Sequence, residues 1–242
     1  TNIPSSNWPH LSTFHNSEVF DPDRVSVLVD AVTRVSALDC PERDLLLLGI
    51  ASAAERLGYY RKDGRALRIL RKDIEIVPRR KLVVEHVLQS IWTSYAEDLS
   101  ALSNLRAMTV GKAQVLQGDG RTLTALTDSG VKQGTVDIFA YSPPYLNHID
   151  YTEVYKVELW LLKYVLFQSQ MLALRKQTLR SHASYSFSVD RTGLPVKLAD
   201  IVDVLADEIE TTGKNWHKYF RNTALGYFQD MKTAFSRQLE YL

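Results

Sequence analysis

The chain has 242 residues, of which 45% are hydrophobic and 24% are charged, a balance typical of a globular protein with one large or two small domains. Its formal net charge of +1 does not indicate a nucleic-acid partner. No apolar run approaches the roughly 20 residues of a membrane-spanning helix, and no signal peptide is visible. The single cysteine, Cys40, excludes a disulfide within the chain and fits a reducing compartment. We therefore expect a cytoplasmic protein with no membrane partner.

The first hundred residues have the pattern of a helical region. Asp21 and Pro22 form a typical helix start, and apolar side chains then recur at helical spacing. A second helix is predicted over about 41–58 and a longer one over about 79–105. Residues 1–107 are therefore expected to be mainly helical.

A basic stretch connects the second and third of these helices. Between Arg61 and Lys81 there are nine basic residues, opposed only by Asp63, Asp73 and Glu75. Such a stretch can follow a phosphate backbone, although a solvated loop and helix end explains it equally well. The residues predicted here to contact DNA are Arg65, Arg68, Arg71, Arg79 and Arg80.

The pattern changes near Met108. Apolar runs predict strands over 113–117 and 136–141. Helices are predicted over 152–167, 197–211 and 214–242. Strands that alternate with helices predict a parallel, doubly wound sheet. We therefore expect an α/β fold in which an α/β region, residues 108–242, follows a large helical N-terminal portion.

The second predicted strand runs into Ser142-Pro143-Pro144-Tyr145. Each proline fixes its own φ at about −65° and removes an N–H donor, and it also restricts the residue before it. The loop is therefore stiff, and its carbonyls and the Ser142 hydroxyl can accept hydrogen bonds from an amino group. Tyr145 offers a flat face to a planar base. A proline-rich turn without a function is the alternative.

Residues 136–151 resemble the catalytic loop of the amino-group DNA methyltransferases, which use S-adenosylmethionine to methylate cytosine N4 or adenine N6. Residues 152–162 also resemble the helix after that loop in one bacterial subgroup, and residues 14–120 resemble the preceding segment more loosely. Serine at the first loop position is more usual in the cytosine-N4 enzymes. The resemblance implies a partial Rossmann-like methyltransferase sheet, S-adenosylmethionine as cofactor, DNA as partner, and a role in restriction-modification or phage defence.

The loop residues have distinct expected roles in this chemistry. The Ser142 hydroxyl and the Pro143 carbonyl would hold the amino group and stabilise the positive charge that develops on its nitrogen. Pro144 stiffens the loop. Tyr145 would stack on a base rotated out of the duplex. Asn147 and His148 follow the loop and are expected to contact DNA, although a simple surface position suits His148 as well.

Gly118 and Asp119 follow the first predicted strand, and the resemblance implies that they bind the cofactor together with Ser142. The Asp119 carboxylate would accept a hydrogen bond from the adenine amino group. A plain Gly-Asp-Gly turn explains these residues equally well. No spacing of histidines in the sequence indicates a metal site.

One departure from the resembling family concerns the cofactor. None of the 11 glycines forms the glycine-rich loop that follows the first strand in that family. Three explanations are open: these residues are part of a longer protein, a second polypeptide supplies the loop, or the chain is a degenerate enzyme that only binds DNA. Methylation of RNA amino groups is a further alternative, because related RNA enzymes share a similar loop.

Overall fold

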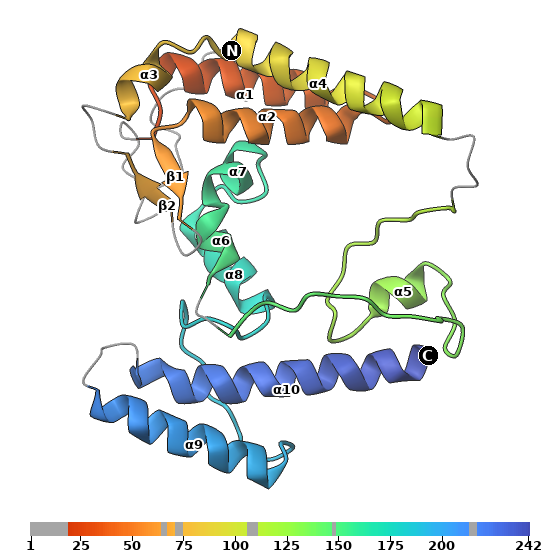
Figure 1. Cartoon of the computed structure of the whole chain (residues 1–242), viewed down its shortest axis with the longest axis vertical. Coiled ribbons are helices and arrows are strands. Elements are labelled where there is room, and N and C mark those ends of the chain that lie inside the picture. The colour runs from red at the N-terminus through yellow and green to blue at the C-terminus, as the bar shows by residue number, and fades with distance from the viewer. Residues whose placement is uncertain (1–18, 64–66, 71–74, 106–110, 147–148, 213–216) are drawn as a thin grey trace. The chain divides into compact units, whose positions relative to one another are not determined.

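The computed structural model describes residues 19–63, 67–70, 75–105, 111–146, 149–212 and 217–242 (Figure 1). It divides into two compact units. The first, here called the helical unit, combines Thr1–Gly111 with Tyr151–Ala173. The second, here called the loop-bearing unit, combines Lys112–Asp150 with Leu174–Leu242. Each unit is described by itself.

The helical unit is built from helices and one short hairpin (Figure 1). In the hairpin, Tyr60 of β1 lies opposite Ile69 of β2, and Lys62 lies opposite Leu67, in antiparallel register. The last helix of the unit, α8, crosses the boundary between the two units. The elements in chain order are α1 (Pro22–Ser36), α2 (Arg43–Leu57), β1 (Tyr60–Lys62), β2 (Leu67–Ile69), α3 (Ile76–Arg80), α4 (Val84–Leu105), α6 (Tyr151–Val154), α7 (Lys156–Leu161) and α8 (Gln168–Gln177).

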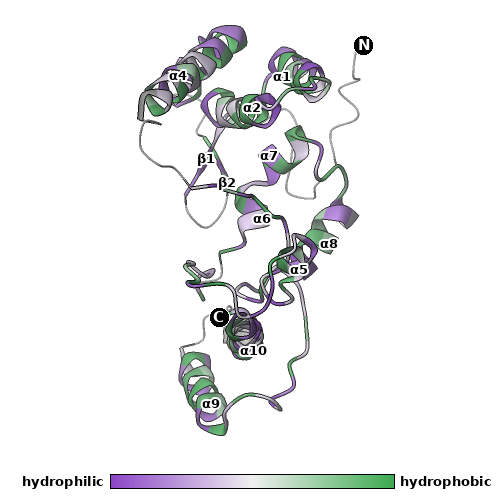
Figure 2. Ribbon diagram, turned by 90° about the vertical axis from the view of Figure 1, so that its right-hand side faces the viewer, coloured by the Kyte–Doolittle hydropathy of each residue, from purple (hydrophilic) through white to green (hydrophobic). Residues whose placement is uncertain are grey.

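The core of the helical unit lies where α2 packs against α1 and α4. In Figure 2 these helices alternate between hydrophobic and hydrophilic residues, as expected for helices that bury one face. Gly49 allows the close approach of α4, because a Cβ atom there would meet Trp92 Nε1 at 2.5 Å. The same Nε1 donates a hydrogen bond to the Leu46 carbonyl at 3.2 Å. The core side chains of these helices are Leu28, Val29, Val32, Val35, Ile50, Ala53, Ala54, Leu57, Val84, Leu88 and Ile91.

A buried arginine joins the ends of several elements in the helical unit. Arg24, on α1, is 8% exposed. Its guanidinium donates to the carbonyls of Leu57 at 3.0 Å, Arg79 at 2.7 Å and Leu82 at 2.9 Å. These carbonyls lie at or just beyond the C-terminal ends of α2 and α3, where helical partners run out. Arg24 therefore supplies hydrogen bonds at the ends of α2 and α3, and at the Arg79 carbonyl it adds to the Leu82 N–H, which donates at 3.1 Å.

The loop-bearing unit contains α5 (Thr124–Asp128), α9 (Val196–Thr211) and α10 (His217–Tyr241), joined by long irregular segments (Figure 1). Helices α9 and α10 pack against each other. Their shared core consists of Leu194, Ala199, Val202, Ala224 and Leu225. The sequence prediction of helices over 197–211 and 214–242 is confirmed to within a few residues for the part of α10 that the structure describes.

The predicted parallel sheet is wrong. Among the described residues, strands occur only in the antiparallel β1–β2 hairpin, and no Rossmann-like sheet is present there. Residues 113–117 and 136–141 have no regular secondary structure. Val115 is 98% exposed and Ile138 is 78% exposed. Apolar, β-branched content favours an extended backbone locally, but a strand also needs a neighbouring chain for its N–H and C=O groups.

Two predicted helices also differ from the structure. The third helix of the N-terminal region begins at Val84, and two of its expected first residues, Arg79 and Arg80, belong instead to the separate short helix α3. The helix predicted over 152–167 is divided into α6 and α7 and ends early. It ends because Lys163 adopts a left-handed conformation with φ +65°. Within the described residues, no helix has the length and apolar character needed to cross a membrane.

Candidate functional site

The segments before and after the Ser142–Tyr145 loop are packed within the loop-bearing unit. On the side before the loop, the Val136 N–H donates to the Tyr241 carbonyl at 3.0 Å, and the Tyr141 ring lies 5.7 Å from the Phe235 ring, centroid to centroid. On the side after it, Leu146 packs against the α9–α10 core. The segment before the loop therefore lies against α10, and the residue after it packs against the core that α9 and α10 share.

The two side chains with expected substrate roles are exposed. Tyr145 is 63% exposed and Ser142 is exposed, whereas Pro143 and Pro144 between them are half-buried. In the part of the chain that the structure describes, neither the Ser142 hydroxyl nor the Tyr145 hydroxyl makes a hydrogen bond to another residue. The loop therefore offers a free hydroxyl and a free aromatic face, while its prolines rest against the protein.

A buried ion pair fixes the chain shortly after the loop. Asp150 is 4% exposed, and its Oδ2 lies 2.9 Å from Nε of Arg175 and 4.0 Å from Nδ1 of His182. Removing such a charge from water costs free energy unless it is paired, so the pair holds Asp150 firmly. Asn147 and His148, both predicted DNA contacts, lie outside the described residues.

Asp119 has a hydrogen-bonding partner from its own turn. Its carboxylate accepts from Arg121 Nη2 at 2.7 Å, from Arg121 Nε at 3.0 Å and from the Arg121 backbone N–H at 2.8 Å. The side-chain hydrogen bonds from Arg121 hold the pKa of Asp119 below its ordinary value. Arg121 also lies 3.3 Å from Asp230 of α10, which in turn binds Arg180 at 2.7 Å.

Gly118 and Asp119 thus hold a turn together. A Cβ atom at Gly118 would meet the Ala125 side chain at 2.7 Å, so glycine permits the close approach of α5 rather than leaving room for a ligand. Asp119 is engaged by Arg121, as described above. The residues predicted to bind the cofactor with Ser142 do not form a cradle for it in this conformation. The alternative of a Gly-Asp-Gly turn matches their geometry.

The predicted DNA-contacting arginines have different environments. Arg79 donates to the carbonyls of Glu55 at 2.7 Å and Tyr60 at 3.0 Å, so it has a structural role at the end of α2 that the sequence did not indicate. Arg80 is exposed, with its guanidinium 5.6 Å from the Tyr59 ring centroid. Arg68 is exposed and pairs with Asp63. Arg65 and Arg71 lie outside the described residues.

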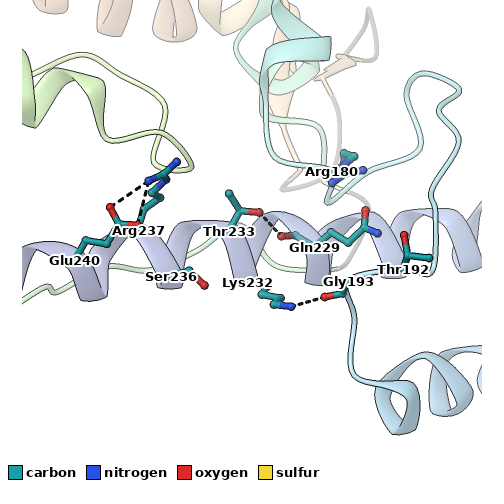
Figure 3. Close-up of a pocket in the computed structure, with 9 residues that line it drawn as sticks. All are labelled: Arg180, Thr192, Gly193, Gln229, Lys232, Thr233, Ser236, Arg237 and Glu240. Atoms are coloured by element: carbon teal, nitrogen blue, oxygen red, sulfur yellow. Dashed lines mark hydrogen bonds and ion pairs between the residues drawn. The ribbon is translucent and has the colours of Figure 1, made fainter.

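A polar pocket of about 600 Å³ lies along α10, and the sequence analysis did not identify it (Figure 3). Three basic residues and one acidic residue contribute to it, together with hydroxyl groups. Lys232 is tied to the Gly193 carbonyl and Arg237 to Glu240. The spacing of the α10 residues, three or four apart, places them on one helix face, which was the available sequence signal. The lining residues are Arg180, Thr192, Gly193, Gln229, Lys232, Thr233, Ser236, Arg237 and Glu240.

No family model, no curated protein and no solved structure matches this chain.

Proposed function

We propose that this chain carries the target-base loop of an S-adenosylmethionine-dependent DNA methyltransferase that modifies an exocyclic amino group. Cytosine N4 is the preferred target and adenine N6 the second. The observation that supports this most directly is the presentation of Ser142 and Tyr145, both exposed, on a loop whose two ends pack against α10 and against the α9–α10 core. Restriction-modification or phage defence is the setting that the resemblance suggests.

The loop suits an exocyclic amino group because the lone pair of its nitrogen is delocalised into the ring. Such a nitrogen is a poor nucleophile until its N–H bonds are held in a more pyramidal arrangement. The Ser142 hydroxyl and the Pro143 carbonyl can accept those two N–H bonds. Acceptors fixed in advance also stabilise the positive charge that develops on the nitrogen. Since both ends of the loop are anchored, little reorganisation is needed when the base arrives.

Tyr145 is the proposed stacking partner of the base. A target nitrogen inside the duplex is out of reach, so the base must leave the helix before it reacts. Stacking on an aromatic side chain is worth about 1–3 kcal/mol per base. With 63% of its surface exposed, Tyr145 has a ring face available for this contact.

Two basic regions are proposed to bind the DNA backbone. The pocket along α10 belongs to the same unit as the loop, and its arginines, lysine and hydroxyl groups are typical phosphate ligands. In the helical unit, exposed Arg80 and Lys81 continue the basic stretch. Neutralising several phosphates in this way makes binding strongly dependent on salt.

S-adenosylmethionine is the cofactor that the proposed reaction requires. Gly118 and Asp119 do not fit its adenine end, because the Asp119 carboxylate is filled by Arg121. We therefore assign this chain the binding of the amino group and the base, and derive no step through the cofactor. A second polypeptide or a further segment that carries a glycine-rich loop is the proposed source of the cofactor site.

A methyl-transfer assay tests the proposal. DNA with unpaired cytosines or unpaired adenines is incubated with labelled S-adenosylmethionine and the protein, with and without its native partners, and RNA of the same sequence runs in parallel. We expect transfer to the DNA cytosine amino group. Ser142→Ala should lower the rate about a hundredfold, and Tyr145→Ala should weaken base binding about tenfold.

Tyr219→Ala is the matched control, because Tyr219 is also a half-exposed tyrosine of the loop-bearing unit, at 49% exposure. It should leave transfer unchanged. Full activity in both the Ser142 and the Tyr145 variants would defeat the assignment. Transfer of the methyl group to RNA but not to DNA would show that RNA is the substrate.

A DNA-binding subunit without catalysis is the second candidate, and the filled Asp119 carboxylate is the observation that favours it. It predicts salt-dependent DNA affinity together with no heat of binding when S-adenosylhomocysteine is titrated into the protein. Calorimetry on the chain alone and on the chain with its partners separates this candidate from a complete enzyme.

A further inference from the structure

Helix α9 is apolar on two faces, and the loop-bearing unit covers one of them. Ala199 and Val202 are buried in the core that α9 shares with α10. On another side of the same helix, Ile201 is 49% exposed and Val204 is 58% exposed. An amphipathic surface helix ordinarily buries its apolar face and presents polar residues to water. The second apolar face therefore has no role in the α9–α10 core.

The exposed face is a hollow of about 570 Å³ that is lined by residues of α9. Along it, Lys197, Ile201, Val204 and Glu208 follow one another at spacings of four, three and four residues. This spacing places their side chains in one line along a helix, as in the seam of a coiled coil. The line, here called the α9 seam, has a cation at its start, two apolar residues at its centre and an anion at its end.

The charges at the ends of the α9 seam do not serve the helix itself. The N-terminus of a helix favours negative charge, and its C-terminus favours positive charge. Lys197 lies in the first turn of α9 and Glu208 in the last, which is the reverse of this preference. Within the part of the chain that the structure describes, neither side chain makes an ion pair or a hydrogen bond. Both charges are therefore open to a partner.

A second copy of α9 in antiparallel orientation complements this seam. When the two helices run in opposite directions about a twofold axis, Lys197 of each copy faces Glu208 of the other, and Ile201 of each faces Val204 of the other. A parallel pair would place like charges opposite each other, and a lipid surface would leave Glu208 without a cation. We propose that this chain forms an antiparallel, twofold dimer through the α9 seam. The dimer does not require the proposed methyl transfer.

The residues beside the seam are compatible with this pairing. On one flank, Leu205 is exposed and adds apolar surface. On the other flank, Asp200 and Asp207 would approach their counterparts in the second copy. Each of them is paired within its own chain, Asp200 with Arg191 at 2.8 Å and Asp207 with Arg221. These pairs offset the repulsion between like charges on that flank.

The expected dimer is weak, because the seam is short. Helix α9 has 16 residues, which corresponds to a length of about 24 Å. One helix pair of this length buries less than the roughly 1,600 Å² of a standard interface. We expect a Kd between about 10 μM and about 1 mM. Sedimentation equilibrium of the full chain over this range of concentrations should show a reversible monomer–dimer equilibrium.

Charge reversal tests the antiparallel pairing. Lys197→Glu and Glu208→Lys should each weaken the dimer about tenfold, because each turns two attractive contacts into repulsive ones. The double variant should restore the original Kd. Within one chain the two residues are 11 positions apart, about 16 Å along the helix, so this rescue requires contact between copies. Both reversals suit the helix dipole, and circular dichroism should therefore show no loss of helix.

Ile201→Asp tests the apolar centre of the seam and should leave the chain monomeric at every concentration. Leu239→Asp is the matched control, because Leu239 is a 70% exposed leucine on α10 of the same unit, and this variant should still dimerise. If Ile201→Asp fails to fold, the charge-reversal set decides alone. A chain that is monomeric throughout, a dimer that survives Ile201→Asp, a double reversal that restores nothing, or loss of the dimer in Leu239→Asp would each overturn the proposal.

Discussion

The two units of this protein differ in the burial of their apolar residues. In the helical unit, Leu28 and Ile50 are fully buried between helices. In the loop-bearing unit, Val115 and Ile138 are 98% and 78% exposed on irregular segments. A helix satisfies its own backbone and needs only one face covered, whereas an extended segment needs a second chain for its backbone as well. Apolar content is therefore a sufficient signal for the helices of this protein, but it is not sufficient for strands.

The largest expected effect on stability comes from a test that truncates one apolar side chain in each unit. Leu28→Ala should lower the free energy of unfolding by about 3 kcal/mol, because it leaves a cavity in a packed core. Val115→Ala should change it by less than about 0.5 kcal/mol, because the valine already contacts water. Urea unfolding followed by circular dichroism measures both. Similar losses for the two variants would show that residues near Val115 are packed in solution.

A second test concerns polar groups at the ends of the helices. Arg24→Lys keeps the charge but cannot reach three carbonyls, because an ammonium lacks the planar fork of a guanidinium. We expect a loss of about 2 kcal/mol, because these buried and partly buried carbonyls lose the hydrogen bonds from the guanidinium. Arg34→Lys is the control, since Arg34 is 80% exposed and pairs with Asp30 on the surface of the same helix. The control should cost less than about 0.5 kcal/mol.

The same contrast explains which parts of the fold could be predicted from the sequence. The start at Asp21-Pro22 and the helices α9 and α10 follow from local spacing and from proline chemistry. The predicted parallel sheet depended on pairing between distant segments, which no local pattern specifies. Residues 136–141 have the composition of a strand, but they lie against α10 through Val136 and Tyr141.

The candidate site was predictable to a similar degree. Proline geometry predicted a stiff loop. Ser142 and Tyr145 on this loop are exposed, and their roles stay a prediction. The structural role of Arg79 was not predictable, because it depends on carbonyls at the end of another helix. The ion pair of Glu158 was not predictable either, since Glu158 lies on a helix and its partner Lys62 lies on a strand nearly a hundred residues earlier.

The end of α7 offers a smaller test within the helical unit. The Lys163 N–H donates to the Trp160 carbonyl and the Tyr164 N–H to the Leu159 carbonyl, which is the Schellman arrangement usually closed by glycine. Lysine pays a steric cost at φ +65°. Lys163→Gly should therefore raise the free energy of unfolding by about 1 kcal/mol. Lys163→Ala, which keeps a Cβ atom, is the control and should bring no gain. A loss in the glycine variant would mean that Lys163 does not adopt this conformation in solution.

The smallest expected effect lies in the loop-bearing unit, at Asp119. Arg121 lowers the pKa of this carboxyl below its ordinary value of 3.8, mainly through side-chain hydrogen bonds. A pKa depressed by folding stabilises the protein above the ordinary value, and this stabilisation is lost as the pH falls through the folded pKa. Asp119→Asn should therefore cost less than about 1 kcal/mol near neutral pH, because a carboxylate that is 38% exposed is screened by solvent. The difference in stability between the variant and the unaltered chain should then shrink below pH 3.8.

Unfolding curves between pH 7 and pH 2 measure this difference, and an NMR titration of Asp119 in Arg121→Gln should show its pKa rising. A stability difference that stays constant over this range would mean that Asp119 is not paired with Arg121, and its carboxylate would then be free to accept a hydrogen bond from a ligand.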